Sequence, residues 1–145
     1  MAGLDLSKLD TATPAEEGSV VELEHPATGE PLRDPETKKP ITVTLRGKDS
    51  PAVQAVANKQ WDRRQERIRR QKSHSSAAVV EADSVEVLVA ATISWSGIAL
   101  DGEVLECTPE NAYKVYSDDR FPWLVEQLSR ALGDRERFFS QASRA

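Results

Sequence analysis

Four prolines and a glycine crowd into residues 25–40 (HPATGEPLRDPETKKP), and this run limits the possible fold more than any other feature of the chain. An α-helix cannot cross it, because proline lacks a backbone N–H and its ring clashes with the preceding turn. The flanking segments 19–24 (SVVELE) and 41–45 (ITVTL) are short and rich in β-branched residues, which is typical of strands. We therefore expect residues 19–48 to form a β-hairpin with a long loop.

The chain before the hairpin has little with which to build a core. Residues 1–18 contain threonine, proline and acidic residues and few large apolar groups. Such a segment buries too little surface to offset the entropy lost on ordering. We expect it to be a flexible arm.

Helical signals begin at residue 49. Asp49 or Ser50 can cap a helix, and Pro51 fits its first turn, where no backbone hydrogen bond is lost. One face of this helix carries residues at helical spacing: Val53, Ala57, Trp61, Arg64 and Ile68. Small polar residues in 72–76 favour a break after it.

The most apolar stretch, residues 79–95 (VVEADSVEVLVAATISW), fits two periods. Its valines alternate as in a strand, yet several of its apolar residues also share one helical face. Its length exceeds that of most strands, and Asp83 or Ser84 could cap a helix, so we favour a buried helix.

The last third of the chain combines turns with short amphipathic helices. Asp101-Gly102 is a strong turn signal, and Thr108-Pro109 is typical of a capped helix start. A break at residues 117–119 precedes a second amphipathic run from Pro122, which Gly133 can end. We expect an α+β fold that is mainly α: a helical domain of about four helices over residues 49–145, the β-hairpin over 19–48 and the flexible arm over 1–18. We expect no internal repeat.

Charge is distributed unevenly. The chain carries a net charge of −5, yet the segment from Lys59 to Lys72 holds seven bases and two acids, which is +5 and leaves −10 elsewhere. A nucleic-acid-binding module could use this basic segment. Because the rest of the chain is strongly acidic, we rank nucleic-acid binding last among the possible functions. A solvated helix face or an acidic protein partner explains the segment better.

Catalytic and cofactor-binding motifs are missing from the sequence. It has no phosphate-binding glycine loop, no nucleophile elbow and no zinc-protease motif. We expect His25 and His74 to be exposed rather than to act as ligands or bases, and the lone Cys107 to serve packing. We therefore expect no enzyme activity, no cofactor and no metal.

Hydropathy indicates a protein that stays in water. The mean hydropathy is −0.52, and no apolar run approaches the length of a bilayer span. The first residues, MAGLDLSKLD, lack the basic and apolar stretches of an export signal. We expect a cytoplasmic location and no membrane partner.

Several aromatic and basic side chains are candidates for binding a protein partner. The two neighbouring phenylalanines near the end of the chain point about 100° apart on a helix, so one can enter the core while the other faces outward. The candidates are Trp61, Arg63, Arg64, Arg67, Arg70, Phe121, Trp123, Phe138 and Phe139.

Residues 85–139 resemble the tail assembly chaperones of long-tailed (siphovirus-type) bacteriophages. The resemblance lies in a helix ending near Trp95 and Gly97, then CTPEN before a short helix, a second break, and a last helix closing on aromatic residues. It is supported by ITVTLRGKDSPAV leading into an arginine-rich helix, as in small phage proteins of the same gene neighbourhood. The resemblance implies a non-enzymatic, mostly helical protein of the host cytoplasm. It also implies that many copies coat the tape measure protein and help to recruit tail tube subunits.

A second class stays open beside this one. A structural protein of the virion, such as a tail, connector or head component, could also combine a helical domain with an extended hairpin. Its stoichiometric presence in purified particles would distinguish it from a chaperone.

Overall fold

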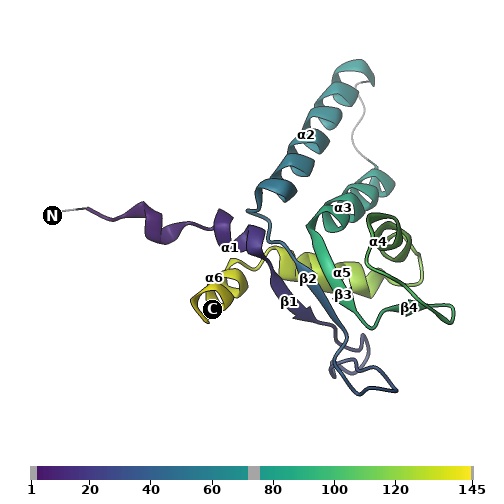
Figure 1. Cartoon of the computed structure of the whole chain (residues 1–145). Coiled ribbons are helices and arrows are strands. Elements are labelled where there is room, and N and C mark those ends of the chain that lie inside the picture. The colour runs from purple at the N-terminus through teal and green to yellow at the C-terminus, as the bar shows by residue number, and fades with distance from the viewer. Residues whose placement is uncertain (1–2, 72–75, 145) are drawn as a thin grey trace.

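A small antiparallel sheet lies in the middle of the molecule, with helices around it (Figure 1). The computed structural model describes residues 3–71 and 76–144. The sheet has the order β1-β2-β3, formed by Ser19–Glu22, Thr42–Leu45 and Thr92–Ser96. Within the described residues the α-helices are α1 (Ala12–Glu17), α2 (Pro51–Gln71), α3 (Ala77–Ala91), α4 (Pro109–Tyr116), α5 (Pro122–Leu132) and α6 (Arg135–Arg144). A 3-10 turn, η1 (Leu6–Leu9), and a two-stranded hairpin, β4 (Ala99–Leu100) with β5 (Glu103–Val104), complete the described elements. The expected class, α+β and mainly α, is confirmed.

The expected hairpin is present and is part of a larger sheet. β1 pairs antiparallel with β2, with Ser19 opposite Leu45. β2 also pairs with β3, which comes from much later in the chain. Because β2 is the central strand, its side chains Val43 and Leu45 are completely buried. The hairpin therefore shares its core with the helices.

The loop of the hairpin contains two copies of a nine-residue unit, LEHPATGEP (23–31) and LRDPETKKP (32–40). The backbone N–H of Leu32 donates to the carbonyl of Leu23, Ile41 N–H donates to Leu32, and Leu23 N–H donates to Ile41. These equivalent residues close a three-membered ring of hydrogen bonds. The expectation of no internal repeat is thus wrong, because the two units share four of nine residues and make equivalent backbone hydrogen bonds.

Residues 79–95 divide into a helix and a strand. α3 begins after Ser76, whose hydroxyl accepts from the N–H of Val79, and it runs through Asp83 and Ser84 without a cap there. The helix ends at Ala91, and β3 continues directly to Ser96. The expectation of one buried helix over this stretch is therefore wrong. Pairing with β2 supplies hydrogen bonds that favour the extended conformation after residue 91.

The end of the expected flexible arm is folded onto the molecule. Residues 12–17 form α1, and Ala15 is buried. The carboxylate of Glu16 accepts a hydrogen bond from Ser50 and pairs with Arg46 at 3.2 Å. The preceding residues stay exposed, including Leu4 and Leu6 at 72% each. The interpretation of residues 1–18 as one arm therefore needs correction, because α1 packs against α6.

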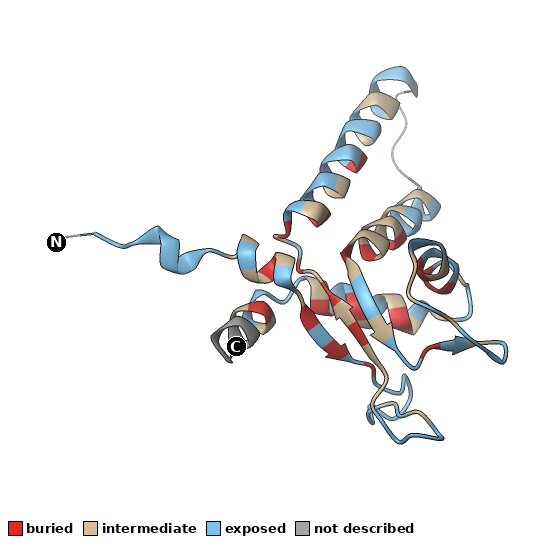
Figure 2. Ribbon diagram, in the orientation of Figure 1, coloured by how far each residue is buried: buried red, intermediate tan, exposed pale blue. Residues whose placement is uncertain are grey.

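α2 begins at Pro51 as expected and projects from the body (Figure 1). Val53 is buried, whereas Trp61 is 58% and Ile68 is 41% exposed. The expected apolar face therefore contacts the core only near its start, and exposed residues dominate the far half of α2 (Figure 2). Ion pairs from Arg63 to Glu86 and from Arg64 to Asp83 attach α2 to α3.

The last third follows the sequence expectations closely. The Thr108 hydroxyl accepts from the N–H of Asn111 and caps α4, with Pro109 in its first turn. Asp101 and Gly102 adopt positive φ angles of 50° and 86° in the turn between β4 and β5. α5 and α6 follow the break at residues 117–119. The buried residues of α4 and α5 are Ala112, Val115, Tyr116, Leu124, Leu128 and Ala131.

Candidate protein-binding surfaces

An open groove of about 520 Å³ runs between α3, α4 and α5, and we call it the α3–α5 groove. Its floor is formed by Val85 and Tyr116, which are buried, and by the half-buried Val125. Val80 on α3 and Tyr113 on α4 also line it, and they are 49% and 58% exposed. The groove thus offers apolar surface that the described residues leave uncovered.

The rim of the groove is acidic. Four carboxylates line it: Glu81 from α3, Asp118 and Asp119 from the turn after α4, and Glu126 from α5. None of the lining residues in the described part of the chain is basic. Asp118 pairs with Arg120 at 2.8 Å. The other three carboxylates have no ion-pair partner among the described residues.

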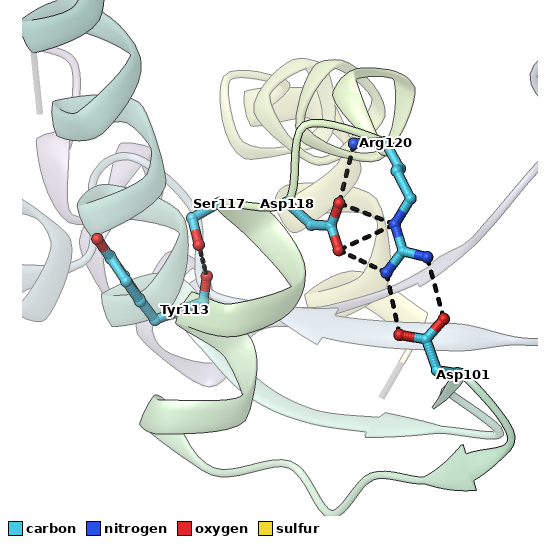
Figure 3. Close-up of polar contacts among 5 residues, drawn as sticks. All are labelled: Asp101, Tyr113, Ser117, Asp118 and Arg120. Carbon is cyan, nitrogen blue, oxygen red and sulfur yellow. Dashed lines mark hydrogen bonds and ion pairs between the residues drawn. The ribbon is translucent and has the colours of Figure 1, made fainter.

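Arg120 fixes the turn that carries two of these acids (Figure 3). Its guanidinium donates to Asp118 and reaches Asp101, in the turn between β4 and β5, at 3.0 Å. Its backbone N–H also donates to the Asp118 carboxylate at 2.9 Å. These hydrogen bonds hold the pKa of Asp118 down at about 2, so this carboxylate is charged at neutral pH. The turn is therefore held in place beside the groove.

Tyr113 and Tyr116 give the groove its aromatic surface. The Ser117 hydroxyl donates to the carbonyl of Tyr113 at 2.6 Å and closes the last turn of α4, and the Tyr113 side chain extends away from Arg120 (Figure 3). The Tyr116 hydroxyl shares a hydrogen bond of 2.7 Å with the Thr92 hydroxyl. Burial raises the pKa of Tyr116 to about 12, so the floor of the groove is neutral.

The expected basic contact residues lie on α2, and most are already paired. Arg63 and Arg64 form ion pairs with α3, and Arg70 pairs with Glu66 at 2.7 Å. One guanidinium nitrogen of Arg67, Nη1, is buried without a hydrogen-bond partner among the described residues. Beside them, Trp61 presents its indole to solvent. α2 therefore offers one exposed aromatic with bases around it.

The other expected aromatics lie elsewhere. Phe121 and Trp123 are half-buried and line a cavity of about 170 Å³ beneath the hairpin loop. Phe138 is buried on α6 and lines a small pocket together with Pro14 and Ala15 of α1, and Phe139 is half-buried. One phenylalanine does enter the core, as expected. The nine candidate residues thus lie in three separate places, and none of them lines the α3–α5 groove.

Sequence reasoning missed the residues that form the groove. Val80 belongs to the apolar stretch 79–95, where it looks like core, and Tyr113 lies on a helix whose other apolar residues are buried. The adjacent acids Asp118 and Asp119 are visible in the sequence, but only the fold brings them near Glu81 and Glu126. A large apolar residue outside the helical stripe of α4 is the one sequence signal for Tyr113.

Of the two histidines, the structure describes His25. His25 is exposed, and its Nδ1 accepts hydrogen bonds from the N–H groups of Ala27 and Thr28. His74 lies outside the described residues. Among the residues that the structure describes, no group of three or more His, Cys, Asp or Glu side chains is placed to hold a metal ion. No described helix has the length and apolarity needed to cross a membrane.

No protein-family model, curated protein or solved structure matches the chain. Among the surfaces described above, the α3–α5 groove combines a volume of about 520 Å³ with exposed apolar side chains and a charge of one sign.

Proposed function

We propose that this protein is a phage tail assembly chaperone that binds the tape measure protein and helps to bring tail tube subunits to it. The proposal joins the resemblance of residues 85–139 to one structural observation, the open apolar α3–α5 groove. In this role the chain works without catalysis, in the host cytoplasm, with many copies on one client.

The groove supports the proposal because its exposed apolar surface needs a partner. A bound protein surface would remove Val80 and Tyr113 from contact with water, which favours binding. A long client needs many such contacts, and each can be weak because neighbouring copies on the same client add to the overall affinity. The exposed Trp61 on α2 offers a further contact of the same kind.

Co-expression with the tape measure protein tests the proposal. We expect the wild-type chain to raise the soluble fraction of the client and to co-purify with it. Val80→Asp should reduce both effects, because it places a charge against the apolar surface of the bound client. Val104→Asp is the matched control, since Val104 on β5 is 82% exposed and lies outside the groove.

Two results would contradict the proposal. One is a client that is equally insoluble with and without this chain. The other is a stoichiometric amount of this chain in purified virions, which would favour the structural alternative.

A further inference from the structure

We propose that the α3–α5 groove binds an amphipathic helix that carries basic residues on both sides of its apolar stripe. This inference rests on the proposed function only in taking the partner to be a protein. It names the chemistry of that partner, which the resemblance does not supply.

The dimensions of the groove suit about two turns of helix. Lining residues on α3 run from Ala78 to Val85, and eight residues of helix span about 12 Å. A partner helix lying along this wall would contact it through apolar side chains at positions i, i+3 or i+4, and i+7. It would pack on α3, α4 and α5 as a fourth helix.

A helix fits this groove better than an extended peptide does. All lining residues come from α3, α4, α5 and the turn between α4 and α5, so no strand edge faces into the groove. An extended peptide would leave backbone N–H and C=O groups without partners against Val80, Val85 and Val125. A helix satisfies these groups within its own backbone.

The charges on the rim specify the flanks of the partner. Glu81 lies on the α3 side, while Asp119 and Glu126 come from the opposite side. Because these three carboxylates lack ion-pair partners among the described residues, lysine or arginine beside the apolar stripe would complement them. Asp118 contributes less, since Arg120 already neutralises part of its charge.

A second copy of this chain is the weaker candidate for the groove. The exposed part of α2, with Trp61 and Ile68, is amphipathic and basic. Several of its bases are already engaged, with Arg63 bound to Glu86 and both Arg69 and Arg70 bound to Glu66. Docking α2 into the groove would compete with these pairs, so a helix of another protein is favoured.

Fluorescence anisotropy with designed helical peptides tests the inference on the full chain. The probe is a labelled, end-capped peptide of about 15 residues with leucines at i, i+3, i+4 and i+7 and lysines beside them. A second peptide has glutamates in place of the lysines, and a third has the basic composition with the leucines spread around the helix. We expect the basic amphipathic peptide to bind about tenfold more tightly than either control.

A charge reversal in the groove should remove this preference. Glu81→Lys with Glu126→Lys should weaken binding of the basic peptide about tenfold and strengthen binding of the acidic one. Glu22→Lys with Glu103→Lys makes the same change in net charge at exposed positions outside the groove and should change binding less than about twofold. Binding of the basic peptide should also weaken as salt concentration rises.

Three results would overturn the inference. These are equal affinity for the basic and acidic peptides, equal effects of the two reversals, and a groove reversal that changes self-association in sedimentation but not peptide binding. The last result would make the groove a contact between copies. None of them bears on whether the tape measure protein is kept soluble, so this inference and the proposed function fail separately.

Discussion

At the scale of single residues, one position of the nine-residue unit is filled by two chemically different side chains. Asp34 Oδ1 accepts from the N–H groups of Glu36 and Thr37, as His25 Nδ1 does from Ala27 and Thr28. Each acceptor satisfies two backbone donors at the start of a tight turn. The imidazole therefore has the same role as the carboxylate, that of hydrogen-bond acceptor, and its Nδ1 must be unprotonated to accept.

This equivalence predicts opposite outcomes for two substitutions. His25→Asp should leave the melting temperature unchanged or raise it, because a carboxylate oxygen replaces Nδ1 as the acceptor. Asp34→Ala should cost about 1 kcal/mol, because two N–H groups lose their acceptor. Thermal unfolding measures both, with His25→Ala as the control for simple loss of the side chain. Equal losses for His25→Asp and Asp34→Ala would contradict the assignment.

Arg120 gives a second prediction at this scale. Since the Arg120 guanidinium and backbone hydrogen bonds hold the pKa of Asp118 down at about 2, the charged form is favoured in the folded state. The stabilisation is therefore complete above the ordinary aspartate pKa of 3.8 and is lost as pH falls toward about 2. Arg120→Gln should lower the melting temperature at pH 7 and make little difference near pH 2.

The control for this experiment is Arg130→Gln, which changes an exposed arginine of α5 that forms no ion pair among the described residues. It should show no such pH dependence. A constant difference in melting temperature between wild type and Arg120→Gln from pH 7 to pH 2 would show that the stabilisation by Arg120 does not depend on the Asp118 charge.

At the scale of elements, the two halves of α2 differ in the contacts that hold them to the rest of the protein. Its first half is anchored by Val53 in the core and by Gln60, whose amide donates to the Asp83 carbonyl at 2.8 Å. Beyond Arg64 no residue of α2 is buried among those described. A helix segment that lies beside a single neighbouring helix and has no residue in the core opens more readily than a segment buried between several neighbouring elements.

Amide hydrogen exchange should therefore become faster from the start of α2 toward its end. We expect the amides of residues 65–70 to exchange faster than those of residues 54–60, and both faster than the amides around Leu128 in α5, which is completely buried. Native-state exchange followed by mass spectrometry or NMR measures this order. Uniform protection along α2 would mean that its far half has a partner in solution.

At the scale of the whole molecule, α1 and α6, which lie near opposite ends of the sequence, pack against each other. The N–H of Gly47 donates to the carbonyl of Ala15 in α1, and Phe138 of α6 packs where a side chain at Gly47 would clash. Arg135 pairs with Asp49 at 2.6 Å on the same side. α1 and α6 thus close one side of the fold together, which places the boundary of the folded body inside residues 1–18.

Truncation tests this boundary. Removing residues 1–9 should shift the melting temperature by less than about 2 °C, because the described residues of that segment are exposed and Asp10, which caps α1, is kept. Removing residues 1–18 should cost about 1–3 kcal/mol, since the burial of Ala15 and the Glu16 contacts are lost. Equal changes in stability for the two truncations would mean that residues 1–18 form one arm without stabilising contacts to the folded body.

Signals that act within a few residues were readable from the sequence. The helix starts at Thr108-Pro109 and at Pro51 depend on hydroxyl groups that accept from nearby backbone N–H groups, and the structure confirms both. The turn at Asp101-Gly102 depends on two residues that tolerate positive φ angles, and the structure confirms it too. The hairpin of residues 19–24 and 41–45 was also predictable from local sequence, because β-branched segments flank a run that no helix can cross.

Tertiary contacts decided the rest. The change from helix to strand at Thr92 follows from the free edge of β2, since the local pattern fits both periods. The exposure of Trp61 depends on how far α2 extends beyond the core, and helical spacing alone does not reveal this. The α3–α5 groove joins residues from three helices, so Val80, Tyr113 and Glu126 become neighbours only through long-range packing, which no short window of sequence contains.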